Sequence, residues 1–107
     1  MVDLLVKLPE KQPALRVMPM PADVNQHGDV FGGWIMSQVD IAGATVAMRR
    51  ARGRVATVAV NAFAFKQPVS VGDVVSFFAE VAEVGRTALK GTVEVLAERN
   101  AEKPEIF

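Results

Sequence analysis

Residues 25–40 of this 107-residue chain read NQHGDVFGGWIMSQVD, a glycine-rich turn that runs directly into an apolar helix. The helix carries one acidic side chain, Asp40, about two turns after the glycine pair. A carboxylate inside an apolar helix costs free energy unless a ligand or a partner group uses it. This stretch is therefore the first candidate for an active-site segment.

The composition is that of a small folded domain. Half of the residues are hydrophobic and 22% are charged, which is typical of a chain that folds around a core. At this length we expect a single domain over residues 1–107. Twelve basic residues balance twelve acidic ones, so no net positive field favours a nucleic-acid partner. The absence of cysteine excludes disulfides and zinc-thiolate sites and fits a reducing compartment.

The amino-terminal residues do not resemble a secretion signal. They have an acid at position 3, a very short apolar run and no small-residue cleavage site. No apolar stretch approaches the roughly 20 residues that cross a bilayer. We therefore expect a cytoplasmic protein without membrane insertion.

One long helix is predicted. A short strand over Ala14 to Met20 precedes it, and the helical pattern runs from Trp34 to about Arg50. Nearly every side of this segment is apolar, which is typical of a buried central helix. Gly53 follows a cluster of arginines and is expected to end the helix in the left-handed conformation.

Three extended segments follow the helix, over Val55 to Phe65, Val74 to Val84 and Thr87 to Glu98. Gly72-Asp73 and Gly85-Arg86 supply turns between them, and the second turn is short enough to join the last two segments as a hairpin. A helix followed by antiparallel strands predicts an α+β domain whose sheet curls around the helix. Residues 103–107 read as an incomplete final strand, whose edge a partner would cover unless the natural product is longer.

Asp40 shares its helix face with small residues. Positions three, four and seven residues away lie on the same stripe. These positions are Gly33, Met36, Ser37, Gly43, Ala44 and Ala47. Bulkier side chains on the other stripes are expected to pack on the sheet, and they are Trp34, Ile35, Val39, Ile41, Ala42, Val46 and Met48. Another chain or a ligand can therefore approach Asp40, although a structural role as a cap or an ion-pair partner of the nearby arginines is the alternative.

The glycine pair favours a catalytic role. The backbone amides of Gly33 and Trp34 at a helix amino end are expected to lack acceptors and to hold an oxyanion. An oxyanion donor and a carboxylate on one helix suit an acyl-transfer site. Gly32, Trp34 and Ser37 are the neighbouring positions that we expect to contact substrate.

Several blocks together resemble one family. Residues 20–23, Asn25, residues 28–38 and Asp40 are similar to the YciA-type acyl-CoA thioesterases of the hotdog-fold superfamily. Residues 53–58, Phe65 with residues 68–69, and residues 71–75 match the later blocks of that family in order. The resemblance covers about residues 16–98, and the combined pattern is specific although each block alone is weak.

The resemblance implies a hotdog fold, in which a curved antiparallel sheet wraps a long central helix. Two subunits join their sheets into a dimer, often within a trimer of dimers. The implied reaction is hydrolysis of acyl-CoA to a free acid and coenzyme A, without metal or cofactor. Asp40 would act as general base or nucleophile, the Gly33 amide would polarise the thioester oxygen, and Asn25 of the other subunit would place water or the carbonyl.

Basic residues are candidate contacts for the nucleotide end of coenzyme A. Four arginines lie between positions 49 and 54, and arginine binds phosphate oxygens in a two-pronged geometry. Arg54 and Lys66 are the positions that we expect to assist substrate binding. The alternative is a helix carboxyl end whose charges complement the helix dipole and remain in solvent.

Two other functions remain open. A non-catalytic hotdog module would bind acyl-CoA or an acyl carrier without needing Asp40, and a thiol-release assay separates it from an enzyme. Hydration of enoyl thioesters would need an acid and a histidine acting together. The single histidine, His27, lies in the loop before the helix, so its distance from the Asp40 site decides that alternative.

Overall fold

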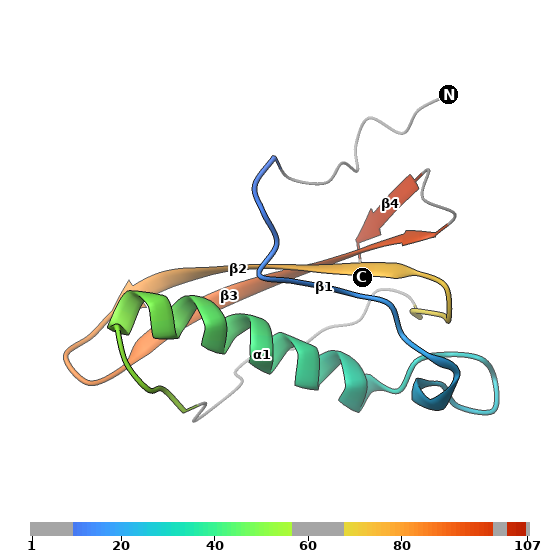
Figure 1. Cartoon of the computed structure of the whole chain (residues 1–107), viewed down its shortest axis with the longest axis horizontal. Helices are drawn as coiled ribbons and strands as arrows, with labels where there is room; N and C mark the ends of the chain where they lie inside the picture. Colours follow the sequence, from blue (N-terminus) through green and yellow to red (C-terminus); the bar gives the residue numbers. More distant parts are fainter. Residues whose placement is uncertain (1–9, 57–67, 100–102, 107) are drawn as a thin grey trace.

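One long helix lies against an antiparallel sheet in the computed structural model, which describes residues 10–56, 68–99 and 103–106 (Figure 1). The elements are β1 (Leu15–Val17), the 3-10 helix η1 (Pro21–Asp23), α1 (Gly32–Ala51), β2 (Val74–Val84), β3 (Leu89–Arg99) and β4 (Lys103–Ile106). This arrangement confirms the α+β class that the sequence predicts.

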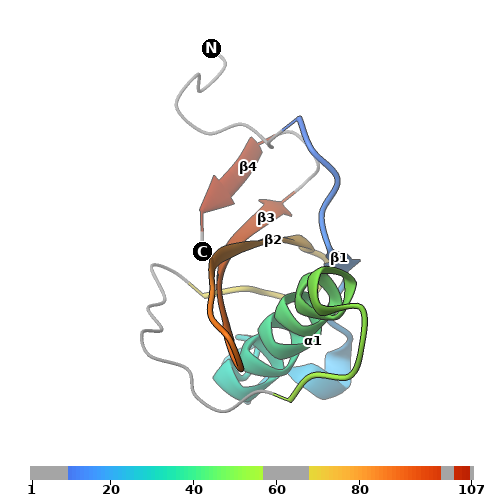
Figure 2. The ribbon, with the colours of Figure 1, turned by 90° about the vertical axis from the view of Figure 1, so that its left-hand side faces the viewer.

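The described strands form one sheet in the order β1-β2-β3-β4, and each neighbouring pair is antiparallel. β2 and β3 form its long central hairpin, with Phe77 opposite Val95. The hairpin loop is closed by a 2.8 Å hydrogen bond from the Gly85 amide to the Ala88 carbonyl. Viewed along the helix, this hairpin curves around one side of α1 (Figure 2).

The core lies between α1 and the face of the sheet that covers it. The helix contributes Ile35 and Ala42, which lie two turns apart on one stripe. The sheet contributes Val75, Phe77 and Ala97, and these side chains are fully buried. Helix and sheet therefore hold each other through apolar contact, and the opposite side of α1 is left for other functions.

The predicted strands differ from the observed ones mainly in their limits. The 74–84 prediction matches β2, whereas β3 begins and ends slightly later than predicted. β1 is shorter than the Ala14 to Met20 prediction, since Pro19 cannot donate to a strand ladder. The strand predicted at residues 103–107 is present as β4, paired with β3. The strand predicted at 55–65 lies outside the described residues, except for 55 and 56, which are unpaired.

The ends of α1 also differ from the prediction. The helix begins at Gly32, two residues earlier than expected, and Arg52 takes the left-handed conformation that we expected of Gly53. The Arg52 backbone has φ 56° and ψ 41°, and its amide donates to the Met48 carbonyl at 2.8 Å. The closing bond has to be made by the first residue after the last helical turn. Arg52 is therefore the left-handed residue because of its position in the chain, even though glycine adopts that conformation more easily.

One side of α1 is exposed in this chain, so the prediction of a helix buried on all sides is wrong for it. Met36, Ile41 and Met48 expose 46%, 51% and 48% of their surfaces. The expectation that Ile41 and Met48 pack on the sheet is likewise wrong. A single sheet covers one side of a helix, and these positions lie on the other side.

Candidate active site

The loop before α1 is folded around the side chain of Asn25. Its Oδ1 accepts hydrogen bonds from the amides of His27 at 2.8 Å and Asp29 at 3.2 Å. The backbone amide of Asn25 donates to the backbone carbonyl of Asp29 at 2.7 Å. Gly28 completes the turn with a φ of 83°, a conformation that glycine adopts without strain. These bonds use the Asn25 oxygen, so its Nδ2 group is the part that remains for substrate, as a hydrogen-bond donor.

The start of α1 presents exposed glycines. Gly32 and Gly33 are the first two helical residues, and both are exposed. Among the described residues, the Gly33 amide has no backbone acceptor, as expected in a first helical turn. Apart from its chain neighbours and its own helix backbone, a Cβ atom placed on Gly33 would meet no atom of the described residues within 4 Å. The space beside this amide is therefore open to a substrate or to another chain.

The Trp34 amide does not match its prediction. It donates a 3.0 Å hydrogen bond to the carbonyl of Phe31, the residue before the helix. Because α1 begins earlier than predicted, Trp34 is its third residue and can reach that carbonyl. Its side chain is half-buried and packs against the core. Gly33, and not Trp34, therefore provides the candidate oxyanion donor.

Asp40 lies on the exposed side of α1, together with Ser37, Met36 and Ile41. Its side chain is accessible in this chain, so the burial cost inferred from the apolar sequence does not apply to it. Accessibility agrees with the helical projection, which placed Asp40 opposite the residues that pack on the sheet. An accessible carboxylate on the same side of the helix as the exposed Met36 and Ile41 can approach a substrate that also has an apolar part.

Gly33 and Asp40 share a stripe but are separated along the helix. Seven residues at a rise of about 1.5 Å place them roughly 10 Å apart. The loop that holds Asn25 lies beyond the amino end of α1 (Figure 1). Within one chain, the three predicted catalytic residues are therefore spread along the direction of α1 and do not meet at one point.

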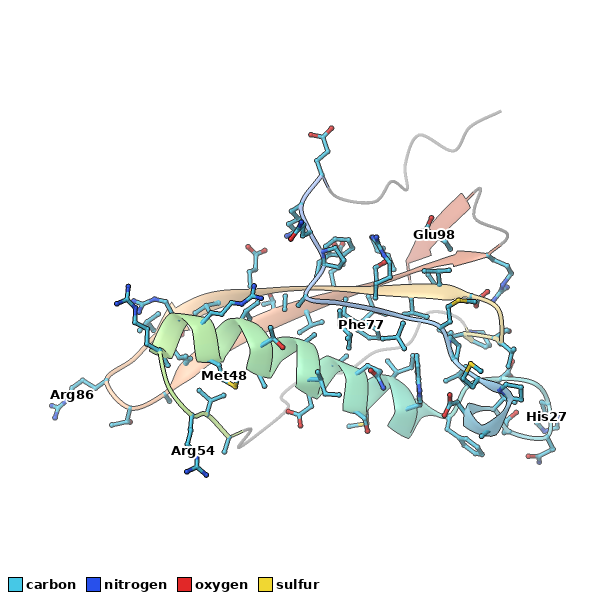
Figure 3. The ribbon with its side chains drawn as sticks, viewed as in Figure 1. His27, Met48, Arg54, Phe77, Arg86 and Glu98 are labelled. Carbon is cyan, nitrogen blue, oxygen red and sulfur yellow. The ribbon has the colours of Figure 1, made fainter. Side chains whose placement is uncertain are left out.

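A shallow hollow, open to solvent, lies at the other end of the helix. It has a volume of about 410 Å³ and is lined by Met48, Arg49, Gly53 and Arg54. Arg54 is exposed there, and Figure 3 shows its side chain below the carboxyl end of α1. The hollow therefore combines apolar surface with two arginines. Lys66, the second predicted helper, lies outside the described residues.

His27 does not join the Asp40 site within this chain. It is exposed in the loop at the amino end of α1, and Figure 3 shows it at the opposite end of the molecule from Met48 and Arg54. The first residue of α1 is already eight positions before Asp40, about 12 Å along the helix. An acid and histidine pair is therefore not formed by these two residues of one chain.

Sequence reasoning missed one buried acid. Asp73 was read as part of a turn, yet its side chain is 2% exposed and forms an ion pair with Arg99 at 2.9 Å. The available signal was an acid directly after a turn glycine and before a strand of apolar residues. The partner arginine lies 26 positions further along, at the end of β3, so sequence spacing did not reveal it.

Within the described part of the chain, no group of three or more histidine, cysteine, aspartate or glutamate side chains is placed to hold a metal ion. No helix there is long and apolar enough to span a membrane.

Sequence comparison matches a family model described as the thioesterase superfamily over residues 27–103. The acyl-CoA thioester hydrolase YciA of Escherichia coli strain K12 is 45% identical over 97 residues, which are 91% of this chain and 74% of that protein. Across similar curated relatives, this chain spans between 58% and 74% of the relative's length.

Comparison with solved structures likewise finds thioesterases. A hexameric thioesterase from Yersinia pestis is 42% identical with a TM-score of 0.86, over 92% of this chain and 81% of that one. A hexameric hotdog-fold thioesterase of Campylobacter jejuni is 43% identical with a TM-score of 0.80, over 83% of this chain and 67% of that one. The helix and sheet described above therefore have the hotdog arrangement.

Proposed function

The chain belongs to the thioesterase superfamily, and from that premise we propose that it hydrolyses acyl-CoA thioesters to a free carboxylic acid and coenzyme A. The observation that carries this proposal is an accessible carboxylate, Asp40, on the same exposed helix stripe as the open amide of Gly33. Thioester hydrolysis needs a base or nucleophile and a donor for the oxygen that becomes negative. These two groups supply both needs.

In the proposed reaction, Asp40 takes a proton from water as the water oxygen attacks the thioester carbon. The carbonyl oxygen becomes negatively charged and is held by the Gly33 amide. When the intermediate collapses, the carbon–sulfur bond breaks and the thiolate of coenzyme A leaves. Asp40 returns its proton to that sulfur, so the carboxylate is regenerated. No cofactor takes part in these reaction steps, and the coenzyme A moiety is part of the substrate.

Asp40 can act as a general base, as in the steps above, or as a nucleophile that attacks the thioester carbon directly. We propose the general-base route, because it needs no covalent intermediate on the protein.

Asn25 contributes from a neighbouring copy in this proposal. The loop that carries Asn25 lies beyond the amino end of its own helix (Figure 1), and the Asn25 Nδ2 donor has no hydrogen-bond partner among the described residues. A donor can bind the carbonyl oxygen or the lone pair of the attacking water. Two copies with joined sheets, assembled as a dimer or a trimer of dimers, would bring this donor to Asp40. The hexameric state of the Yersinia and Campylobacter relatives supports such an assembly.

The hollow at the carboxyl end of α1 would receive the nucleotide end of coenzyme A. Arg54 supplies charge for phosphate, and Met48 supplies apolar surface beside it. Lys66 remains a proposed helper, and Gly32, Trp34 and Ser37 remain proposed contacts near the thioester. We place this activity in one domain over residues 1–107 of a cytoplasmic enzyme, to which the absence of cysteine is suited.

The proposal is tested by release of free thiol from acyl-CoA substrates of several chain lengths. We expect release by the wild-type protein and a loss of about 100- to 10,000-fold in Asp40→Asn, since Asp40 provides the general base. Glu83→Gln, which removes an exposed acid from β2, is the matched control and should retain full activity. Tight acyl-CoA binding without thiol release would instead support the non-catalytic module.

A further inference from the structure

Asp73 is a buried acid whose oxygens are occupied by three donors. Arg99 donates from Nε to Oδ1 at 3.0 Å and from Nη2 to Oδ2 at 2.9 Å. The Ser70 amide donates to Oδ2 at 2.9 Å. A buried carboxylate costs free energy unless it is paired in this way. The pair therefore joins the end of β3 to the turn that precedes β2.

The same arginine holds the beginning of that turn. Arg99 Nη2 also donates to the Pro68 carbonyl at 3.2 Å, and the Asp73 amide donates to the Ser70 carbonyl at 3.1 Å. Gly72 allows the turn through a φ of 92°. One guanidinium thus contacts both ends of residues 68–73, which fixes the path of this segment against the sheet.

The 68–73 turn also holds the loop that carries Asn25. The Val69 carbonyl accepts a 2.7 Å hydrogen bond from the Val30 amide, and Asp29 pairs with Ser70 in an antiparallel bridge. Asp29 is also the residue that closes the loop, through its bonds to Asn25. A continuous set of hydrogen bonds therefore runs from β3 to Asn25, and Val30 lies two residues before the start of α1.

We propose that Asp73 and Arg99 are positioning residues, which hold the 68–73 turn so that it places the Asn25 loop and the amino end of α1 for the reaction. This inference rests on the proposed function, because it assigns these residues an effect on thioester hydrolysis. Neither residue needs to touch substrate. A displacement of about 1 Å at a reacting group lowers the rate by up to about 100-fold, so a loosened turn has a large effect.

A second arginine offers a matched control. Arg16 donates from its Nε to Ser76 Oγ at 2.7 Å, so it also ties a strand to β2 through one guanidinium. Its bond lies between β1 and β2, away from the hydrogen bonds that hold the 68–73 turn. Arg16→Met should therefore lower stability without changing the Asn25 loop, whereas Arg99→Met should change both.

The experiment compares wild type, Arg99→Met, Arg99→Lys and Arg16→Met, below the melting temperature of each. Thiol release gives kcat and KM, and amide hydrogen exchange at Val30 reports the bond between turn and loop. We expect Arg99→Met to lower kcat about 10- to 100-fold with little change in KM, and to speed Val30 exchange at least about tenfold. Arg99→Lys keeps the charge but not the two-pronged contact, so it should be intermediate. If Arg99→Met does not fold, Arg99→Lys is compared with wild type and Arg16→Met instead.

The outcomes separate the two proposals. An inactive wild-type protein would overturn the proposed function itself. An active wild type would overturn the positioning role if kcat in Arg99→Met equalled that of Arg16→Met, or if Val30 exchange were unchanged. A selective fall in kcat together with faster Val30 exchange, absent from Arg16→Met, supports it.

Discussion

The side-chain oxygen of Asn25 lies 2.8 Å from the backbone nitrogen of His27 and accepts its hydrogen bond, so this end of the asparagine serves the loop. The Nδ2 end remains for the reaction, and substitutions can separate the two roles. Asn25→Asp keeps an acceptor for the loop but removes the donor. Asn25→Ala removes both.

We therefore expect Asn25→Asp to keep the free energy of unfolding within about 0.5 kcal/mol of wild type while lowering kcat/KM at least about tenfold. Asn25→Ala should lose activity and also about 1 kcal/mol of stability, because backbone amides lose their partner. Denaturant unfolding and thiol release measure these effects. Equal stability losses in both variants would contradict the separation of roles.

Gly33 offers a second separation of stability from activity. Alanine stabilises a helix relative to glycine by up to about 1 kcal/mol, and a Cβ at this position meets no atom of the described residues outside its local backbone. Gly33→Ala should therefore fold at least as stably as wild type. Its methyl group would stand beside the proposed oxyanion donor, so kcat/KM should fall about tenfold or more.

Gly43→Ala is the matched control for this variant, because it makes the same substitution in the same helix. A Cβ there would make ordinary contact with Val93 at 3.9 Å, on the side that faces the sheet. We expect unchanged kinetics. Full activity in Gly33→Ala, measured by thiol release, would remove this amide from the proposed mechanism.

The sequence predicted the elements that depend on local pattern. An extended apolar segment bounded by turns located β2 within its observed limits, and the long apolar run located α1. Gly72 and Gly85 marked the turns, as expected of residues that favour them. These features could be predicted because neighbouring residues alone determine them.

The features that the sequence did not reveal depend on distant contacts. Asp73 and Arg99 pair across 26 positions, and no periodicity connects them. The exposed side of α1 was predicted as buried, because an apolar helix gives the same pattern whether the sheet or another chain covers it. The roles of Asn25, Gly33 and Asp40 rested on family resemblance, since spacing alone leaves a structural role for each.

Arg52 holds a left-handed backbone that costs a residue with a Cβ about 1 kcal/mol or more. Arg52→Gly should therefore raise the free energy of unfolding by about 1 kcal/mol. Gly53 does not adopt a positive φ, so Gly53→Ala should not lower the free energy of unfolding through backbone strain. Urea unfolding of the two variants measures the difference, and a less stable Arg52→Gly would show that this side chain makes compensating contacts.

The water mechanism predicts where oxygen from solvent is found. In a single turnover in oxygen-18 water, we expect the label in the released carboxylic acid and none in the Asp40 side chain. Direct attack would form an anhydride with Asp40, and attack of water on the aspartyl carbon of that anhydride would label the Asp40 carboxylate. Mass spectrometry of the product and of the peptide that contains Asp40 distinguishes these results. Label in Asp40 would overturn the water mechanism and require the nucleophilic role of Asp40.

Arg54 lines the hollow at the end of α1, whereas the exposed Arg50 of the same helix end does not. If the hollow binds the nucleotide end of coenzyme A, Arg54→Ala removes a charge-assisted hydrogen bond and should raise KM about tenfold with little change in kcat. Arg50→Ala should retain the wild-type KM. An acyl-pantetheine thioester, which lacks the nucleotide, should react equally with wild type and Arg54→Ala. Equal effects of the two arginine substitutions on acyl-CoA would indicate a general attraction of positive charge instead of a site in the hollow.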